Sequence, residues 1–131
     1  MDWNGLLKNL VNPNVRCFYA AVHSVQTGKC LDYLPFAIYP GASGEEVRDL
    51  AKCHREPLLL YGHGATIAKL RYTFLKMEGP HIILLRRPDV KCAVGFANTV
   101  VVIAVYPVNA PSQPIVLTLQ EMCDQLIRQC Y

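Results

Sequence analysis

The second half of the chain is a succession of short apolar segments joined by very short turns, and this feature constrains the fold most. Period-two and β-branched patterns predict strands over residues 58–61, 66–77, 81–85, 90–96 and 99–106. Turn-forming residues separate the last four segments: Gly79-Pro80, Arg86-Arg87-Pro88-Asp89 and Ala97-Asn98. A parallel crossover needs about a dozen residues or more, so these strands are expected to form an antiparallel sheet.

Nearer the N-terminus, residues 18–25 and 30–33 are apolar and flank the turn signal Thr27-Gly28, which predicts a hairpin. Three other segments have helical periodicity. In residues 3–11 one apolar stripe contains Trp3, Leu6, Leu7, Leu10 and Val11.

The second helix is expected to begin at Ser43, which forms a capping box with Glu46. After a loop over residues 107–114, the last helix begins near Pro114 and keeps its spacing to the C-terminus. The order helix, hairpin, helix, strand meander and helix predicts a single α+β domain over residues 1–131. A chain of this length can bury a core without disulfides or metals.

Composition excludes several classes of protein. Hydrophobic residues make up 52% and charged residues 18%, which argues against a disordered chain. The net charge of +3 is too small for a dedicated nucleic-acid binder. The longest apolar run, Thr99 to Val108, is far shorter than a membrane-spanning helix requires, and Met1-Asp2-Trp3-Asn4 does not resemble the start of a signal peptide.

The six cysteines contain no C-x-x-C pair and are expected to be reduced, mostly buried residues of a cytoplasmic protein: Cys17, Cys30, Cys53, Cys92, Cys123 and Cys130. A disulfide framework is the alternative, and it would require an oxidising compartment.

Catalytic and metal motifs are weak. Cys53-His54 has only His63 nearby as a further ligand, which is too few for a metal site. A Cys–His nucleophile pair formed in space remains an alternative. Gly62-His63-Gly64 lacks the pattern of a phosphate-binding loop. We expect no enzymatic activity, no metal and no cofactor.

Several strings, in this order and spacing, resemble the profilin family over essentially the whole chain. They are Met1-Asp2-Trp3-Asn4, Ala20-Ala21-Val22 with Gly28, residues 44–50, Arg71-Tyr72-Thr73-Phe74-Leu75, residues 99–106 and residues 121–131. The resemblance implies a central antiparallel sheet with the N- and C-terminal helices on one face and smaller helices on the other. It also implies a monomeric, cytoplasmic, cytoskeletal protein that binds monomeric actin and proline-rich proteins such as formin-type nucleators.

The resemblance assigns proline-peptide binding to a groove between the terminal helices and the first hairpin, at Trp3, Leu6, Leu31, Tyr33, Leu126 and Tyr131. Leu6 stands where the family usually has tyrosine, Leu31 where it has tryptophan, and Gln125 where it has histidine or tyrosine. Tyr33 is expected to lie on the same strand face as Leu31 and to compensate in part. Each lost ring is expected to weaken binding by about 1 kcal/mol. The alternative is that Trp3 and Leu126 are ordinary core residues.

Actin binding is assigned in the same way to Lys69, Arg71, Arg86, Arg87, Lys91, Asn98 and Glu121. A basic sheet face would meet an acidic partner surface, and the same cations would suit phosphoinositide headgroups. The alternative is that Arg86-Arg87 only solvates a hairpin. Ile115, Val116, Leu117 and Leu119 replace the usual polar residues early in the last helix, where an exposed apolar patch would favour a different partner.

A dimeric adaptor of the roadblock type is the competing class, because it has a similar helix–sheet–helix order. Such modules self-associate through an exposed strand or helix. The long apolar segment 99–106 would suit that role.

Overall fold

The computed structural model describes residues 1–34 and 41–131. Its elements are α1 (Trp3–Leu7), β1 (Tyr19–Ser24), β2 (Cys30–Leu34), α2 (Gly44–Arg55), α3 (Leu59–His63), β3 (Ala65–Ile67), β4 (Leu70–Glu78), β5 (Ile82–Arg86), β6 (Val90–Phe96), β7 (Val100–Pro107) and α4 (Gln113–Arg128). The described strands form one seven-stranded sheet in the order β2-β1-β7-β6-β5-β4-β3. Every neighbouring pair is antiparallel, as the short turns predicted.

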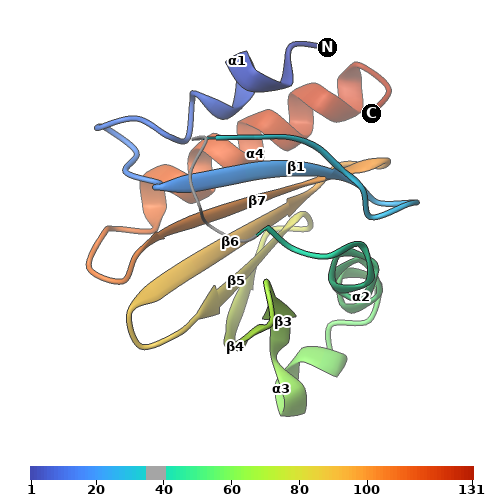
Figure 1. The fold of residues 1–131 in the computed structure, drawn as a ribbon, viewed down its shortest axis with the longest axis vertical. Coiled ribbons are helices and arrows are strands. Elements are labelled where there is room, and N and C mark those ends of the chain that lie inside the picture. The colour runs from blue at the N-terminus through green and yellow to red at the C-terminus, as the bar shows by residue number, and fades with distance from the viewer. Residues whose placement is uncertain (35–40) are drawn as a thin grey trace.

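Helices cover both faces of the sheet. α1 and α4 lie on one face, and α2 and α3 lie on the other (Figure 1). Leu7 of α1 and Leu119 of α4 belong to one apolar core, whereas Leu50 of α2 and Leu60 of α3 belong to the second. This arrangement confirms the α+β fold that the sequence and the resemblance predicted.

β7 is the centre of the molecule. Its residues alternate between the two cores, with Val102 and Ala104 toward α4 and Val101 and Ile103 toward α2. Because both faces are covered, residues 100–106 are buried without exception, which explains the unbroken apolar run. β7 pairs with β1 on one side and β6 on the other. The strand that the adaptor alternative required at the surface is therefore not available for self-association.

The β1–β2 turn packs directly against the start of α2. Gly28 has a φ of +77°, and a Cβ there would lie 2.3 Å from the main-chain oxygen of Gly44. Arg48 of α2 donates from its Nη1 to the carbonyl of Thr27 at 3.0 Å. Only glycine allows both this backbone conformation and this close approach. The hairpin and α2 therefore form one unit.

The prediction of a strand over residues 58–61 is wrong, because this segment lies mainly in α3. Helical turns begin after Pro57, with the N–H of Leu60 donating to its carbonyl at 3.0 Å. Gly64, with a φ of +60°, ends the helix. Only Leu60 is fully buried, so one helical face contacts the core. A short apolar run does not distinguish a buried strand from a short helix by periodicity alone.

The prediction of one strand over residues 66–77 is also wrong. β3 and β4 form a tight hairpin, in which Ile67 pairs with Leu70. The two turn residues, Ala68 and Lys69, have φ values of 54° and 65°. Turns of this kind usually contain Asn and Gly, so this one carries no sequence signal.

Both terminal helices are shorter than predicted. α1 ends at Leu7 rather than Val11, because the side chain of Asn12 ties the following turns together. Its Nδ2 donates to the carbonyls of Lys8 and Asn9, and its Oδ1 accepts from two main-chain N–H groups. Leu10 is nevertheless fully buried. α4 ends at Arg128. No helix among the described residues has both the length and the hydrophobicity required to cross a membrane.

Candidate functional site

The end of α4 turns the chain back so that Tyr131 lies over the terminal-helix core. Cys130 adopts a φ of 70°, and the N–H of Tyr131 donates to the carbonyl of Leu126 at 2.8 Å. The N–H of Cys130 donates to the carbonyl of Ile127 at 3.0 Å. These two bonds and the left-handed residue between them define a Schellman motif, in which the last residue packs back on the helix.

Trp3 reaches the same place from α1. The carboxylate of Asp2 caps this helix by accepting from the N–H of Gly5 at 3.0 Å. Trp3 and Tyr131 are both half-buried and pack against the core between the sheet and the terminal helices. Their ring centroids are 5.2 Å apart with an interplanar angle of 73°, an edge-to-face contact. The two ends of the described chain, marked N and C in Figure 1, thus bring two aromatic rings side by side.

The turn between β6 and β7 completes this aromatic site. The main-chain oxygen of Tyr131 accepts hydrogen bonds from both the N–H and the hydroxyl of Thr99. Leu6 of α1 is half-buried and packs against the same core. We call Trp3, Leu6, Tyr131 and Thr99 the aromatic junction. Sequence reasoning missed Thr99, because its role depends on contact with a residue 32 positions away.

Leu126 and Tyr33 do not join the aromatic junction as expected. Leu126 is fully buried, so it supports the rings from below and has no surface to offer a peptide. Tyr33 pairs with Ala21, whose side chain belongs to the core beneath α2. Directly opposite residues of an antiparallel pair point to the same face, so Tyr33 points away from Trp3. Its expected compensation for Leu31 is therefore wrong.

Leu31 is the extra residue of a β-bulge in β2. The register shifts between the pairs Val22–Asp32 and His23–Cys30, which leaves Leu31 without a partner residue on β1. Its side chain is 43% exposed. The bulge interrupts the alternation of side chains along β2, so the assumption that Leu31 and Tyr33 share one strand face was not reliable.

Two of the predicted actin-binding cations, Arg86 and Lys91, share one face of the sheet. Arg86 pairs with Thr73 on one side and with Lys91 on the other, and Lys91 pairs with Tyr106. Tyr106 belongs to the core on the α4 side, so Arg86 and Lys91 point to that side. Arg71 lies two residues before Thr73 on β4, but its guanidinium reaches α3 on the other side of the sheet edge, where it contacts His63. We call Arg86 and Lys91 the basic sheet face.

Lys91 and Arg87 also have structural contacts. Lys91 donates from Nζ to Ser112 Oγ at 3.2 Å and lies 5.4 Å from the centre of the Tyr106 ring. Arg87 lies 3.8 Å from the carboxylate of Asp89 and 5.8 Å from the centre of the Tyr72 ring. By contrast, Arg86 makes no side-chain hydrogen bond or ion pair within the described part of the chain. It is exposed, so its guanidinium is available to a partner.

Asn98, Glu121 and Lys69 lie apart from the basic sheet face. Lys91 is near the start of β6 and Asn98 follows its other end, so the rise along the strand separates them by about 20 Å. Asn98 is instead next to Thr99 in the aromatic junction. Glu121 lines a hollow on the terminal-helix side with Asn9 and Gln125. Lys69 occupies the β3–β4 turn at the far edge of the sheet.

The expected apolar patch at the start of α4 is absent. Ile115 and Leu119 are fully buried and Val116 is 8% exposed, which leaves Leu117 as the exposed apolar residue of that segment. The early part of α4 is apolar because it covers the sheet. No changed partner surface is indicated there.

A different apolar surface lies on α3 and β4. Leu58 is 82% exposed, Tyr61 is 72% exposed and Leu75 is 45% exposed. The ring of Tyr61 contacts that of Phe74 edge to face, with centroids 5.2 Å apart. Thr73 and Leu75 line two adjoining hollows, one of which also contains Arg86 and the other Tyr61. This α3 patch therefore adjoins the basic sheet face. Sequence reasoning missed it because residues 58–61 were expected to be a strand.

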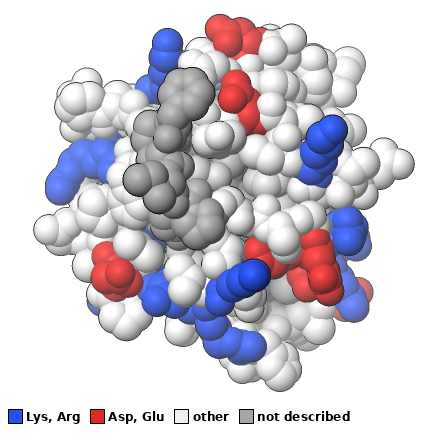
Figure 2. All heavy atoms as spheres, in the orientation of Figure 1, with Lys and Arg blue, Asp and Glu red and all other residues white. Residues whose placement is uncertain are grey.

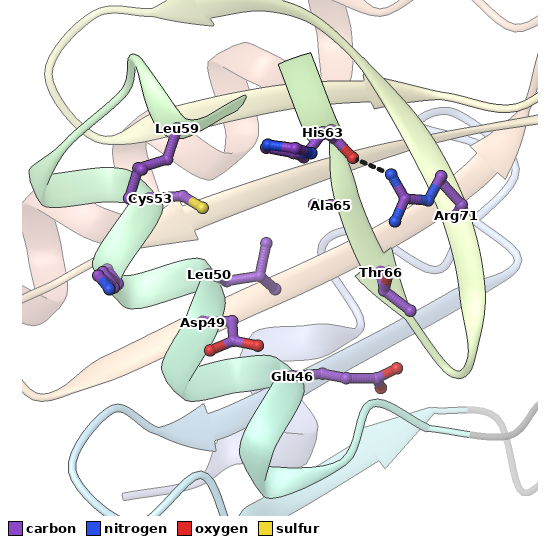
Figure 3. Close-up of a pocket in the computed structure, with 11 residues that line it drawn as sticks. Glu46, Asp49, Leu50, Cys53, Leu59, His63, Ala65, Thr66 and Arg71 are labelled. Carbon is purple, nitrogen blue, oxygen red and sulfur yellow. Dashed lines mark hydrogen bonds between the residues drawn. The ribbon is translucent and has the colours of Figure 1, made fainter. Parts of the chain in front are cut away.

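A pocket of polar and apolar residues lies between α2, α3 and β3 (Figure 3). Arg71 Nη1 donates to the carbonyl of His63 at 2.6 Å, which ties β4 to α3. Burial raises the pKa of the Cys53 thiol, with the neighbouring Asp49 carboxylate adding to the effect. The ring of His54 stacks on Phe96 at 4.2 Å and its Nε2 lies 2.8 Å from the carbonyl of Pro80. His54 is thus engaged elsewhere, and a reactive thiolate is disfavoured.

The described residues contain no group of three or more His, Cys, Asp or Glu side chains arranged to hold a metal ion. All six cysteines are free thiols. Figure 2 shows Lys and Arg side chains interleaved with Asp and Glu over the viewed face, without one continuous basic stripe. Two features of the described surface are candidates for binding a partner: the aromatic junction, and the basic sheet face with its adjoining α3 patch.

The architecture is similar to that of several solved profilins. Profilin IA of Acanthamoeba castellanii matches with a TM-score of 0.80 at 15% identity, over 98% of each chain. Schizosaccharomyces pombe profilin matches with a TM-score of 0.79 at 17% identity, over 96% of each chain. Mouse profilin IIa, solved in complex with a double repeat from the FH1 domain of mDia1, matches with a TM-score of 0.78 at 15% identity, over 100% of each chain.

A sequence search of curated proteins finds no match. The family model described as Profilin matches residues 1–131, which is the full sequence. Together with the seven-stranded sheet between two helical layers, this match establishes that the chain belongs to the profilin family.

Proposed function

We propose that this protein binds proline-rich peptides at the aromatic junction and monomeric actin at the basic sheet face. The edge-to-face contact between Trp3 and Tyr131 is the observation that carries the proposal. Two half-buried rings on the surface, held by different parts of the chain, suit the ridged apolar face of a polyproline II helix. The bound FH1 repeat in the mouse relative supports this class of ligand.

The aromatic junction should bind proline peptides weakly. It contains two rings, because Leu6 replaces the tyrosine that is usual in the family and Tyr33 faces the other side of the sheet. Each missing aromatic contact reduces binding by about 1 kcal/mol, which corresponds to roughly a fivefold higher Kd. We therefore expect a Kd for decaproline above that of a family member with a full set of rings.

Titration of Trp3 fluorescence with decaproline tests this part of the proposal. Trp3 is the single tryptophan, so its emission reports directly on the aromatic junction. Tyr131→Ala should abolish the decaproline-dependent change in emission. Tyr33→Ala is the matched control, because this exposed tyrosine lies on the opposite face of the sheet and its loss should change nothing. An unchanged response in Tyr131→Ala, or no response in the wild type, would rule the site out.

Actin binding is proposed for the surface that joins the basic sheet face to the α3 patch. Protein interfaces combine an apolar, often aromatic centre with a polar rim. Tyr61 and Leu75 supply the apolar centre, and Arg71 and Arg86 supply a cationic rim. Such a surface suits a partner with an apolar contact surrounded by acidic groups. We propose that the protein acts as a monomer there.

Actin-monomer binding, measured by nucleotide exchange and by sedimentation with monomeric actin, tests this surface. Arg86→Glu with Arg87→Glu should reduce affinity at least tenfold, since charge reversal places like charges opposite each other. Tyr61→Ala should reduce it separately. Lys8→Glu with Lys29→Glu is the control, because it makes the same charge change at exposed positions outside the proposed actin-binding surface. Equal affinities in all four proteins would refute the assignment.

A further inference from the structure

We propose that Thr99 is the positioning residue that holds Tyr131 against Trp3 and so preforms the proline-peptide site. This inference rests on the proposed function of the aromatic junction. Both hydrogen-bond donors of Thr99, its N–H and its hydroxyl, are directed at the main-chain oxygen of Tyr131. Two donors from one residue fix that oxygen more firmly than either donor alone.

Tyr131 needs such an anchor because it lies outside any regular element. α4 ends at Arg128, and the chain then turns through Cys130, whose φ of 70° is unfavourable for a residue with a Cβ. Glycine usually occupies this position of a Schellman motif. The local bonds to Leu126 and Ile127 alone therefore hold the turn less firmly than a glycine-containing one would be held.

Thr99 is itself rigidly placed. It lies in the tight turn between β6 and β7, where the N–H of Ala97 donates to the carbonyl of Val100 at 2.9 Å. The carbonyl of Thr99 accepts from the N–H of Val25 at 2.9 Å, which links the turn to the end of β1. Hydrogen bonds therefore fix Thr99 between two hairpins, and Thr99 in turn holds Tyr131 in place. Trp3, which contacts the ring of Tyr131, comes from α1.

Preformation of the ring pair lowers the ordering cost of binding. Without the hydroxyl, Tyr131 should move away from Trp3 for part of the time, and the peptide would have to restore the pair. The hydroxyl does not contact the basic sheet face, which lies at the other end of β6. Its loss should therefore affect proline-peptide binding and leave actin binding unchanged.

Thr99→Val tests the proposal, because it removes the hydroxyl and keeps the N–H and the side-chain shape. Thr99→Ser is the conservative variant that retains the donor. Thr118→Val is the matched control, since it removes a hydroxyl that donates to the carbonyl of Pro114 at 2.8 Å in α4. The measurements are the near-ultraviolet circular dichroism of Trp3 in the free protein, the Kd for decaproline, the Kd for actin and urea denaturation.

We expect Thr99→Val to weaken the Trp3 near-ultraviolet signal and to raise the Kd for decaproline about fivefold, the effect of one lost hydrogen bond. Its actin Kd should not change, and Thr99→Ser and Thr118→Val should resemble the wild type. The proposal is overturned if Thr99→Val keeps the wild-type dichroism, or if Thr99→Ser loses as much signal as Thr99→Val. It is also overturned if Thr118→Val reproduces the change.

The circular dichroism is measured without a ligand, so it tests the role of Thr99 separately from the proposed binding of proline peptides. A wild-type protein that does not bind decaproline would contradict the proposed function alone. The comparison of Thr99→Val with Thr99→Ser would then still decide whether Thr99 holds the ring pair.

Discussion

The carboxylate of Glu46 in α2 accepts a hydrogen bond from the main-chain N–H of Lys69 in the β3–β4 turn, at 2.8 Å. The same carboxylate accepts from the N–H groups of Ser43 and Ala68. One side chain therefore completes the capping box of α2 and holds a hairpin turn whose two residues both have positive φ. This contact joins the helix to the far edge of the sheet.

Glu46→Ala should destabilise the fold. It removes the capping box and leaves three main-chain N–H groups without their acceptor, so we expect the free energy of unfolding to fall by about 2 kcal/mol. Urea denaturation measures this change. Glu45→Ala is the control, because Glu45 is an exposed first-turn acid outside the capping box. Equal losses in the two variants would mean that only the charge near the helix start matters.

Lys69→Gly should stabilise the protein, although it removes a charged side chain. Lys69 has a φ of 65°, which costs a residue with a Cβ about 1 kcal/mol relative to glycine. Thermal unfolding should show a higher Tm for this variant. Lys76→Gly, a change of the same kind inside β4, should lower the Tm, because glycine weakens a strand interior. A lower Tm in Lys69→Gly would contradict this reading of the turn.

His23 should make stability depend on pH below neutrality. It is 1% exposed, its Nδ1 lies 3.0 Å from the carbonyl of Gly28, and its Nε2 has no hydrogen-bond partner among the described residues. Because Gly28 offers only an acceptor, Nδ1 carries the proton. Burial lowers the pKa of His23 from its ordinary value of 6.5, and the bond to Gly28 only partly opposes the shift. The folded protein thus keeps this ring neutral.

The sign follows from proton uptake. Well above about pH 6.5, the ring is neutral in both the folded and the unfolded protein and does not change the free energy of unfolding. Below that pH, His23 binds a proton in the unfolded chain but not in the folded protein, so the free energy of unfolding falls as the pH falls. Urea denaturation between pH 7.5 and 5 should show this slope. His23→Asn keeps a donor for Gly28 without titrating, and the slope should be smaller. Identical slopes would assign the dependence to other groups.

The thiols should react in three groups. Cys30 and Cys130 are exposed, whereas Cys17, Cys92 and Cys123 are buried. Burial raises the pKa of Cys17 and of Cys123 to about 12, which suppresses the reactive thiolate. In the native protein, a thiol-specific chromophoric reagent should label the two exposed cysteines first and the half-buried Cys53 more slowly. Addition of denaturant should expose the remaining three cysteines to the reagent. Rapid labelling of all six in the native protein would contradict the buried assignments.

The turn signals and the apolar pattern predicted much of the sheet. Gly79-Pro80 and Pro88-Asp89 fall between strands that the structure also separates, and Thr27-Gly28 forms the turn of the first hairpin. The capping box of Ser43 and Glu46 was predicted correctly, because it is a local exchange of hydrogen bonds within four residues. These features depend on neighbours in the sequence, which is why the sequence was sufficient.

The errors concern features that distant contacts control. The Ala68-Lys69 turn contains neither Asn nor Gly and is held by Glu46, a residue more than twenty positions earlier. Residues 58–61 were compatible with strand or helix, and packing of Leu60 on the core selected a helix. Pairing with Ala21 placed Tyr33 on the opposite face from Trp3, and the bulge at Leu31 broke the alternation between Leu31 and Tyr33.

By itself, the sequence determined that this chain forms an antiparallel sheet with a helix at each end, because local turns and hydrophobic periodicity fix strand direction and helix faces. Only the tertiary structure decided which side chains meet at the surface. Trp3, Thr99 and Tyr131 come from three separate parts of the chain, and their contact depends on how these parts pack. Contact between side chains of distant segments follows from how those segments pack, which no local pattern encodes.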